Sequence, residues 1–389
     1  MKITFFSNFI NHHQLPLCKA FLERDNVEFT FVATEPIPNE RKVMGYRDGF
    51  DAYILRTYES SENYEKARKL CVDCDVMIFG SAPLEYLDMR MAKNKPTFYY
   101  TERILRKGYY RRFIPTTRRK INRAYINYKD KNLYILCSSA YASYDLKLCG
   151  FNENKCFTWG YFPEVIKYDE EELFRKKQNE KVEILYAGRL IKLKRVADVI
   201  KALKKLESKG VNNFHLTIIG DGDDKPLLQK LVNKTNLSKY VTFLPFMSPE
   251  EVREYMLKSN VYVFSSNMFE GWGAVINEAL NSGCAVVASH YPGAVPTLIK
   301  NGENGLIYPC ANINALEGAL QKVIEDKDLT LSLGKKGYET MLGWNAEVAV
   351  DRFIYMCENI DLNINVFKNG ILSISKPLKN DWINKGAKL

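Results

Sequence analysis

The stretch Phe269–Leu280, FEGWGAVINEAL, decides how this 389-residue chain is interpreted. It lies between two short apolar runs, VYVFSS (261–266) and CAVVASH (284–290), which are rich in valine and typical of buried parallel strands. The segment between them predicts a loop with two glycines, followed by a helix that begins near Ala274. This pattern indicates one strand–loop–helix–strand unit of an α/β protein.

Two carboxylates of this stretch fall in different elements, Glu270 in the loop and Glu278 about one turn into the helix. A loop that leads into a helix offers unpaired N–H groups and a positive dipole end, which attract phosphate. Gly271 and Gly273 would let a ligand approach the backbone closely. We therefore expect Glu278 to accept hydrogen bonds from ribose hydroxyls and Glu270 to face the group attached to the phosphate. The alternative is a simple turn with two solvated glutamates.

FEGWGAVINEAL resembles the E-x7-E signature of the family-4 retaining glycosyltransferases, which adopt the GT-B fold. The resemblance continues through CAVVASHYPGAVPTLIKNGENGLIY and back through YAGRLIKLKRVADVIKAL, HLTIIGDGDD and VTFLPFMSPEEV, so it covers roughly residues 182–325. It implies an α/β chain of two Rossmann-like, doubly wound domains facing an interdomain cleft. It also implies an enzyme that moves a sugar from a nucleotide diphosphate sugar, with UDP the most frequent nucleotide in the family.

Cations follow the strand VEILYAGRL, which ends in Gly188 and Arg189, with Lys194 five residues further on. A planar arginine fork and a lysine point charge suit a diphosphate, and here they match the family's arginine–lysine pair. The resemblance also places the base beside the loop that contains Phe246. The expected catalytic residues are Glu270, Arg189 and Lys194, and the expected donor-binding residues are Gly188, Gly271, Trp272, Gly273, Ala274, Val275, Glu278 and Phe246.

The triplet Asp221, Asp223 and Asp224 is similar to a metal-binding DxD motif. It precedes the pattern of a helix, however, where aspartate is a common N-cap and Pro226 fits the first turn. We therefore expect capping, no metal site and no cofactor besides the donor. SPEE (248–251) predicts a capping box at the next helix.

Residues 1–165 alternate apolar runs with helical patterns, which predicts a second parallel sheet in an acceptor-side domain. A charged stretch after it predicts the hinge into a donor-binding domain, residues 166–344. Residues 345–389 are expected to return to the first domain, because GWNAEVAVDRFIYMCENI resembles the family's terminal crossover helix. The tail that starts with LNINVFKNG (362–370) predicts a hairpin or an edge strand.

The first strand runs into a loop that contains His12 and His13, at a place where open α/β sheets bind ligands. This loop lacks the glycine pair that family members often carry. Glu102 and Arg103 stand where many relatives have a histidine that touches the donor sugar. The expected acceptor-side residues are therefore His13, Glu102 and Arg103, with a solvated histidine and a plain ion pair of Glu102 as the alternatives.

The net charge is +10, and cations concentrate between Arg103 and Arg123, interleaved with Tyr109, Tyr110 and Phe113. Such a segment suits an anionic membrane surface, a phosphate-bearing acceptor or nucleic acid, and a solvated helix face is the alternative. No nucleic-acid module accompanies it, so we expect no nucleic acid partner. We predict a lipid-linked glycan acceptor in bacterial surface polysaccharide synthesis, and peripheral membrane contact through residues 103–123.

No apolar run approaches about 20 residues and no signal peptide pattern opens the chain, so we expect a cytoplasmic protein. Cys71 and Cys74 form a CxxC without a second ligand pair, which favours a structural role. A sugar-nucleotide epimerase and a non-catalytic nucleotide-sugar binding protein remain alternative functions. The sequence does not predict the sugar, the linkage or the oligomeric state.

Overall fold

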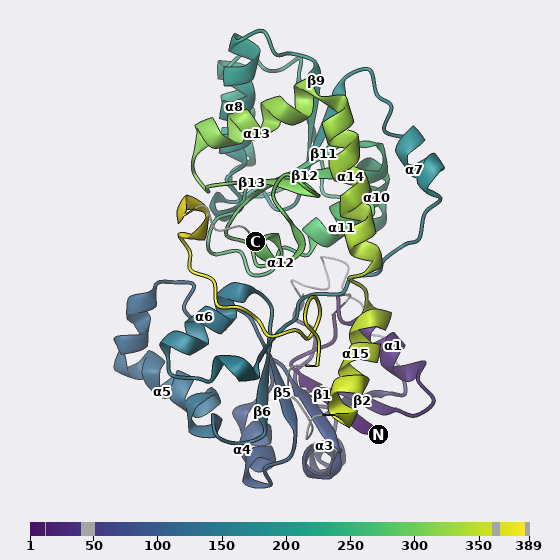
Figure 1. The fold of residues 1–389 in the computed structure, drawn as a ribbon, viewed down its shortest axis with the longest axis vertical. Coiled ribbons are helices and arrows are strands. Elements are labelled where there is room, and N and C mark those ends of the chain that lie inside the picture. Colours follow the sequence, from purple (N-terminus) through teal and green to yellow (C-terminus); the bar gives the residue numbers. More distant parts are fainter. Residues whose placement is uncertain (12, 40–50, 360–365, 386–389) are drawn as a thin grey trace. The chain divides into compact units, whose positions relative to one another are not determined.

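A computed structural model describes residues 1–11, 13–39, 51–359 and 366–385, so His12 and part of the tail lie outside it. The chain divides into two compact units (Figure 1). The first unit comprises Met1–Glu164 and Trp344–Lys379, and the second comprises Val165–Gly343 and the residues from Asn380 onward.

The first unit is built on a seven-stranded parallel sheet in the order β3-β2-β1-β4-β5-β6-β7. The apolar runs of residues 1–165 form its strands, which confirms the predicted doubly wound sheet. Both faces are covered, which is why the strands are mainly apolar. Their bounds are β1 Lys2–Ser7, β2 Glu28–Ala33, β3 Ile54–Arg56, β4 Val76–Phe79, β5 Thr97–Thr101, β6 Leu133–Cys137 and β7 Cys156–Thr158.

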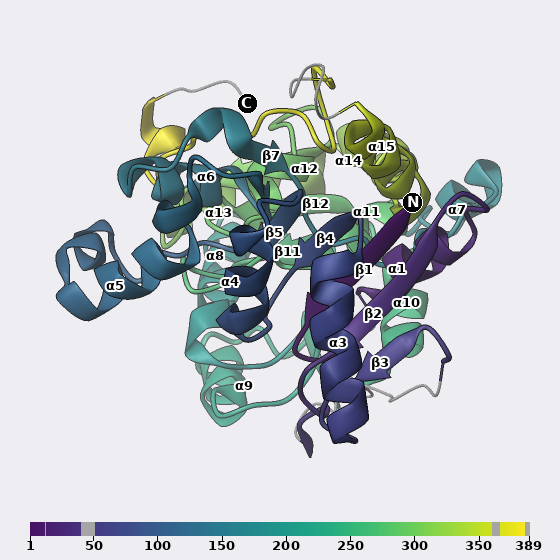
Figure 2. The same ribbon diagram turned by 90° about the horizontal axis from the view of Figure 1, so that it is seen from below.

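Helices cover this sheet on both faces. Figure 2 shows α3 (Ser61–Asp73) and α4 (Leu84–Ala92) on the side of the strands opposite α15 (Ala346–Glu358). The ring of Phe353 in α15 packs against Phe21 of α1 (Leu15–Leu22) and Phe98 of β5, at centroid distances of 5.8 and 4.8 Å. The helix that follows Trp344 thus belongs to the core of the first unit. α5 (Pro115–Ala124) and α6 (Ala140–Leu148) complete this unit.

The CxxC pair is buried and structural. Cys71 and Cys74 are free thiols, and Cys71 donates to the carbonyl of Tyr86 at 3.0 Å. The fully buried guanidinium of Arg90 donates to the carbonyls of Cys71, Val72, Cys74, Asp75 and Pro96. A cation suits this place because the last carbonyls of a helix, here α3, carry negative partial charge.

The second unit holds a six-stranded parallel sheet in the order β10-β9-β8-β11-β12-β13. In Figure 1, α8 (Val196–Ser208) and α13 (Ile313–Glu325) lie on one face, and α10 (Pro249–Lys258), α11 (Val275–Asn281) and α14 (Lys327–Leu342) on the other. α9 (Lys225–Lys234) packs beside α8. The strands are β8 Val182–Ala187, β9 Phe214–Ile219, β10 Val241–Leu244, β11 Val261–Phe264, β12 Ala285–Ser289 and β13 Gly305–Tyr308.

The tail pairs with the edge of the first sheet. Ile374 forms an antiparallel bridge with Phe157 of β7, and Ser375 donates its N–H to the carbonyl of Cys156 at 2.8 Å. The end of the tail departs from the expected return to the first domain, because the residues from Asn380 onward group with the second unit. Among the described residues, no helix combines the length and the apolar character needed to cross a bilayer.

Candidate functional site

The strand order of the second unit reverses between β8 and β11, which makes this pair a topological switch point where open α/β sheets bind ligands. Both predicted donor segments leave the sheet here. The loop after β8 contains Gly188, Arg189 and the short turn Lys192–Lys194. The loop after β11, residues 267–274, is called the donor loop. The two are joined where Asn267 donates its N–H to the carbonyl of Leu193 at 2.8 Å.

Lys194 and Glu270 form an ion pair across these loops. Their Nζ and Oε2 atoms lie 2.6 Å apart, and the two side chains are 13% and 17% exposed. The ammonium also lies 5.2 Å from the centroid of the Phe264 ring, which favours a cation at this position. The structure therefore brings together two of the three expected catalytic residues, as partners of one another.

Arg189 is exposed, and no described residue forms an ion pair with it. The backbone of Arg189 is held in place by Tyr186, whose hydroxyl donates to the Arg189 carbonyl at 3.0 Å. Gly220 allows the close approach of Gly188, the residue before Arg189. A Cβ on Gly220 would lie 2.1 Å from the carbonyl oxygen of Gly188. Burial raises the pKa of Tyr186 most, the charge of Glu270 raises it further, and the charge of Arg189 lowers it.

The donor loop turns into α11 through Gly273, which has a φ of +86° and would place a Cβ 3.0 Å from the ring of Phe264. No described residue accepts a hydrogen bond from the N–H groups of Gly273, Ala274 or Val275. This is the arrangement that favours an anion at the start of a helix. The ring of Phe264 thus contacts the glycine turn and lies close to the Lys194 ammonium.

Trp272 is one of the expected donor-binding residues, and the structure buries its side chain. The indole is 1% exposed, and its Nε1–H donates to Oδ1 of Asn277 at 2.9 Å inside the second unit. A side chain that fills the core beneath α11 cannot contact a ligand. Of Trp272, only the backbone lies in the donor loop.

Glu278 lies in the first turn of α11 and is half-buried. Desolvation raises the pKa of its carboxyl from 4.5 to about 7, with the charge of Arg253 lowering it and that of Glu250 raising it. A carboxyl in such surroundings gains from hydrogen-bond donors that stabilise its charged form. Ribose hydroxyls are donors of this kind.

The aspartate triplet makes no capping hydrogen bond at α9. Asp224 holds the N-cap position in a helical conformation, and its side chain does not cap the helix. Asp221 instead accepts from the N–H of Gly222 at 2.8 Å and from Lys225 at 2.9 Å. The described residues contain no cluster of histidine, cysteine and acidic side chains that would hold a metal ion. The capping box of Ser248 and Glu251 is confirmed.

Phe246 follows β10 and is 59% exposed. A large apolar ring that remains this exposed offers a flat surface for a planar base. The sequence expectation of a base-binding role therefore stays a prediction.

In the first unit, His13 and Glu102 come together through Tyr161. The Tyr161 hydroxyl donates to Oε1 of Glu102 at 2.8 Å, and its ring lies 5.5 Å from that of His13. Arg103 differs from the acceptor-side expectation. Its side chain is 4% exposed and pairs with the buried Asp145 at 3.3 Å, so it stabilises the fold.

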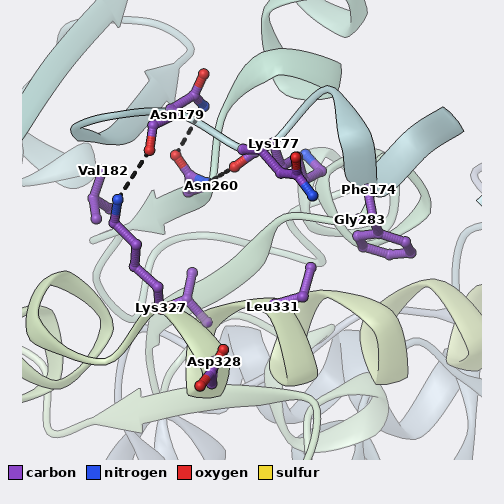
Figure 3. A pocket seen from close by; sticks show the side chains of 11 residues that line it. Phe174, Lys177, Asn179, Val182, Asn260, Gly283, Lys327, Asp328 and Leu331 are labelled. Atoms are coloured by element: carbon purple, nitrogen blue, oxygen red, sulfur yellow. Dashed lines mark hydrogen bonds between the residues drawn. The ribbon is translucent and has the colours of Figure 1, made fainter. Parts of the chain in front are cut away.

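A separate hollow of about 330 Å³ lies at the opposite end of the second sheet, where Val182 begins β8, and Asn260 and Gly283 precede β11 and β12 (Figure 3). Lys177 is one of its lining residues, and its buried ammonium donates to the carbonyls of Met256 and Ser259, at 2.9 and 2.6 Å. Lys327 closes one wall by donating to the Asn179 carbonyl (Figure 3). None of the predicted site residues lines this hollow.

The sequence does not reveal three supporting aromatic residues, Tyr186, Tyr161 and Phe264, because their side chains contact the predicted site residues from within the fold. Each follows the apolar pattern of a strand or its flank, so a buried supporting role leaves no separate signal in one sequence.

Comparison with known proteins gives this site a context. Residues 169–340 match the family model described as glycosyl transferases group 1. The lipopolysaccharide core biosynthesis glycosyltransferase LpsE of Rhizobium meliloti is 27% identical over 174 residues, 44% of this chain and 48% of that protein. The N-acetylgalactosamine-N,N'-diacetylbacillosaminyl-diphospho-undecaprenol 4-alpha-N-acetylgalactosaminyltransferase of Campylobacter jejuni is 33% identical over 146 residues, 38% of each chain. The chain thus spans about half or less of the length of these curated relatives.

Solved structures are similar over a longer part of the chain. The Anabaena protein HepE in complex with UDP has a TM-score of 0.67 at 16% identity, over 93% of this chain and 100% of that one. The apo lipopolysaccharide outer core galactosyltransferase WaaB has a TM-score of 0.64 at 17% identity, over the same shares. The two α/β units therefore follow the GT-B glycosyltransferase fold, and residues 169–340 carry the pattern of glycosyl transferases group 1.

Proposed function

We propose that this protein is a family-4 retaining glycosyltransferase that moves a sugar from a nucleotide diphosphate sugar, with UDP as the first nucleotide to test. The observation that carries the proposal is the meeting of Arg189, the Lys194–Glu270 pair and the unpaired amides of residues 273–275 at one switch point. Fixed donors and cations of this kind stabilise the negative charge that develops on a leaving diphosphate. The match of residues 169–340 to glycosyl transferases group 1 supports the same reaction.

In the proposed reaction, the bond between the anomeric carbon and the diphosphate oxygen breaks while an acceptor hydroxyl attacks the same face of the sugar. The acceptor proton passes to the departing diphosphate. Arg189, Lys194 and the donor-loop amides hold that diphosphate, and Glu270 orients the sugar hydroxyls while its charge is balanced by Lys194. Glu278 holds the ribose. No metal ion or other cofactor takes part in this scheme.

The test uses the raised pKa of Glu278. Ribose hydroxyls stabilise the carboxylate, so donor binding releases the proton that Glu278 carries below pH about 7. We expect donor affinity to be constant above that pH and to fall by up to about tenfold per pH unit below it. Calorimetry with an intact nucleotide diphosphate sugar is suitable, because its diphosphate does not titrate in this range.

Glu278→Gln is the matched control, since it keeps the shape and removes the titrating charge. We expect this variant to bind the donor about tenfold more weakly at high pH and to lose the pH dependence. Equal affinity of both proteins at every pH would contradict the role of Glu278. An epimerase would convert the donor without an acceptor, and a binding protein would bind it without turnover, so product analysis separates these alternatives.

For the acceptor, we propose a lipid-linked, phosphate-bearing glycan at the inner face of a bacterial plasma membrane, with His13 and Glu102 on the acceptor side. The surface of residues 109–120 supports this. Tyr110 and Phe113 are 63% and 68% exposed, and Arg118, Arg119 and Lys120 of α5 are exposed without ion pairs to described residues. Exposed aromatics beside free cations suit an anionic bilayer.

Reversing three of these charges in Arg118→Glu/Arg119→Glu/Lys120→Glu should weaken binding to anionic phospholipid vesicles by about 100-fold, since each cation contributes about 1 kcal/mol. Sedimentation with vesicles measures this. The control Lys201→Glu/Lys230→Glu/Lys234→Glu changes the net charge equally on exposed positions of the second unit. Equal loss in both variants, or no binding by the parent protein, would refute the assigned surface.

A further inference from the structure

Residues 380–385, the last that the structure describes, lie on the second unit at the carboxyl ends of the strands, where the donor loop also lies. Nε2 of His290 lies 3.0 Å from the carbonyl oxygen of Asn380, and the Trp382 ring packs edge-on to His290 at a centroid distance of 6.4 Å. Trp382 is 6% exposed. His290 follows β12 directly, at the carboxyl end of the strand, where ligands bind in this type of sheet.

Both nitrogens of His290 are used in a way that fixes its ring. Nδ1 accepts the backbone N–H of Cys310 at 3.0 Å, so Nε2 carries the proton and donates it to the Asn380 carbonyl. The backbone of His290 is also held, because its N–H donates to the carbonyl of Tyr308 at 3.1 Å. His290 therefore joins the end of the chain to β12 and to the segment after β13.

The residues after His290 hold the donor loop. In this segment, residues 290–294, the N–H of Gly293 donates to the carbonyl of Gly271 at 2.9 Å, and the N–H of Ala294 donates to that of Trp272 at 3.0 Å. Pro292 also lies 3.5 Å from the place of a Cβ on Gly273. These bonds fix the donor-loop carbonyls on one side, while the N–H groups of residues 273–275 stay without described acceptors.

We propose that residues 380–385 are a positioning element of the donor site. Trp382 holds the His290 ring in place and, through segment 290–294, also holds the donor loop in place. Trp382 touches neither the donor nor the reacting atoms in this scheme. The expected effect on nucleotide binding rests on the proposed function. The contacts that lead from Trp382 through His290 to the donor loop are part of the structure itself. The element gives the end of the chain a role in holding the diphosphate, beyond its contribution to stability.

Trp382→Ala tests the inference in the 389-residue chain. We expect binding of the nucleoside diphosphate UDP, or of whichever one the parent protein binds, to weaken by about threefold to tenfold, the usual range for a residue that acts through others. We also expect faster hydrogen exchange at the amides of residues 271–275, because their support is loosened. A chain that stops after Lys379 should behave in the same way, and one that stops after Lys385 should behave as the parent.

Phe174→Ala is the matched control. Phe174 is an aromatic ring of the second unit with the same 6% exposure, packed at the opposite end of β12 beside Gly283. It should lower the melting temperature while leaving nucleotide binding and donor-loop exchange unchanged. Unchanged binding and exchange in Trp382→Ala would overturn the inference. If the parent binds no nucleotide, the proposed function fails, and the exchange at residues 271–275 alone decides the role of Trp382.

Discussion

Replacing Lys194 with alanine is expected to lower kcat for sugar transfer by about 100- to 1000-fold, the loss typical of removing one fixed stabilising group of a developing charge. The Lys194 ammonium contacts Glu270 at 2.6 Å and lies over the Phe264 ring, so it is oriented before a donor binds. Steady-state kinetics with the nucleotide sugar identified by calorimetry measures the effect. The fall should appear in kcat more than in KM, because the charge of the diphosphate grows as the bond breaks.

Lys192→Ala is the control for this prediction. Lys192 belongs to the same short turn as Lys194 and is exposed to solvent. Removing it changes the net charge equally and should leave kcat within about twofold of the parent, as expected for a surface charge that makes no fixed contact. Similar losses in both variants would mean that the general charge of the loop matters and that the Lys194–Glu270 geometry does not.

Gly220→Ala should have the largest effect on stability, because a Cβ at this position would lie 2.1 Å from the Gly188 carbonyl oxygen. The backbone φ of +142° is also unfavourable for alanine. Together these effects should cost about 3 kcal/mol or more of the free energy of unfolding of the second unit. Donor affinity should fall as well, since Gly188 must move and Arg189 with it. Urea unfolding and calorimetry measure the two effects.

Gly210→Ala measures the cost of placing alanine in a left-handed backbone conformation without any steric clash. Gly210 has a φ of +85°, and a Cβ there would meet no atom within 4 Å. The substitution should cost about 1 kcal/mol from the left-handed conformation alone and leave donor binding unchanged. A stability loss in Gly220→Ala no greater than that in Gly210→Ala would show that the approach of Gly188 can relax, and that Gly220 does not set the position of Arg189.

The sequence allowed the fold class to be predicted because both sheets follow from short, continuous apolar runs separated by helical patterns. The order of the donor motifs along the chain then placed them at one switch point, since the loops after β8 and β11 are neighbours in this topology. The position of Glu278 in the first turn of α11 also followed from spacing alone.

Side-chain direction could not be predicted in the same way. Trp272 and Arg103 stand in the expected loops, yet one fills the core and the other pairs with Asp145. Asn277 follows its partner Trp272 by 5 residues, and Asp145 follows its partner Arg103 by 42 residues. Only the folded chain brings each pair together. For the same reason, the contact of the chain's end with His290 had no signal in the sequence.

The central claim is that the second unit holds a nucleotide diphosphate through the switch-point residues. The most direct measurement is calorimetric titration of the 389-residue chain with the common nucleoside diphosphates in the presence of a chelator. The account predicts that one nucleoside diphosphate binds at a single site, that Lys194→Ala and Glu278→Gln weaken this binding, and that Lys192→Ala does not. Absence of binding by every nucleoside diphosphate to the folded parent protein would contradict it.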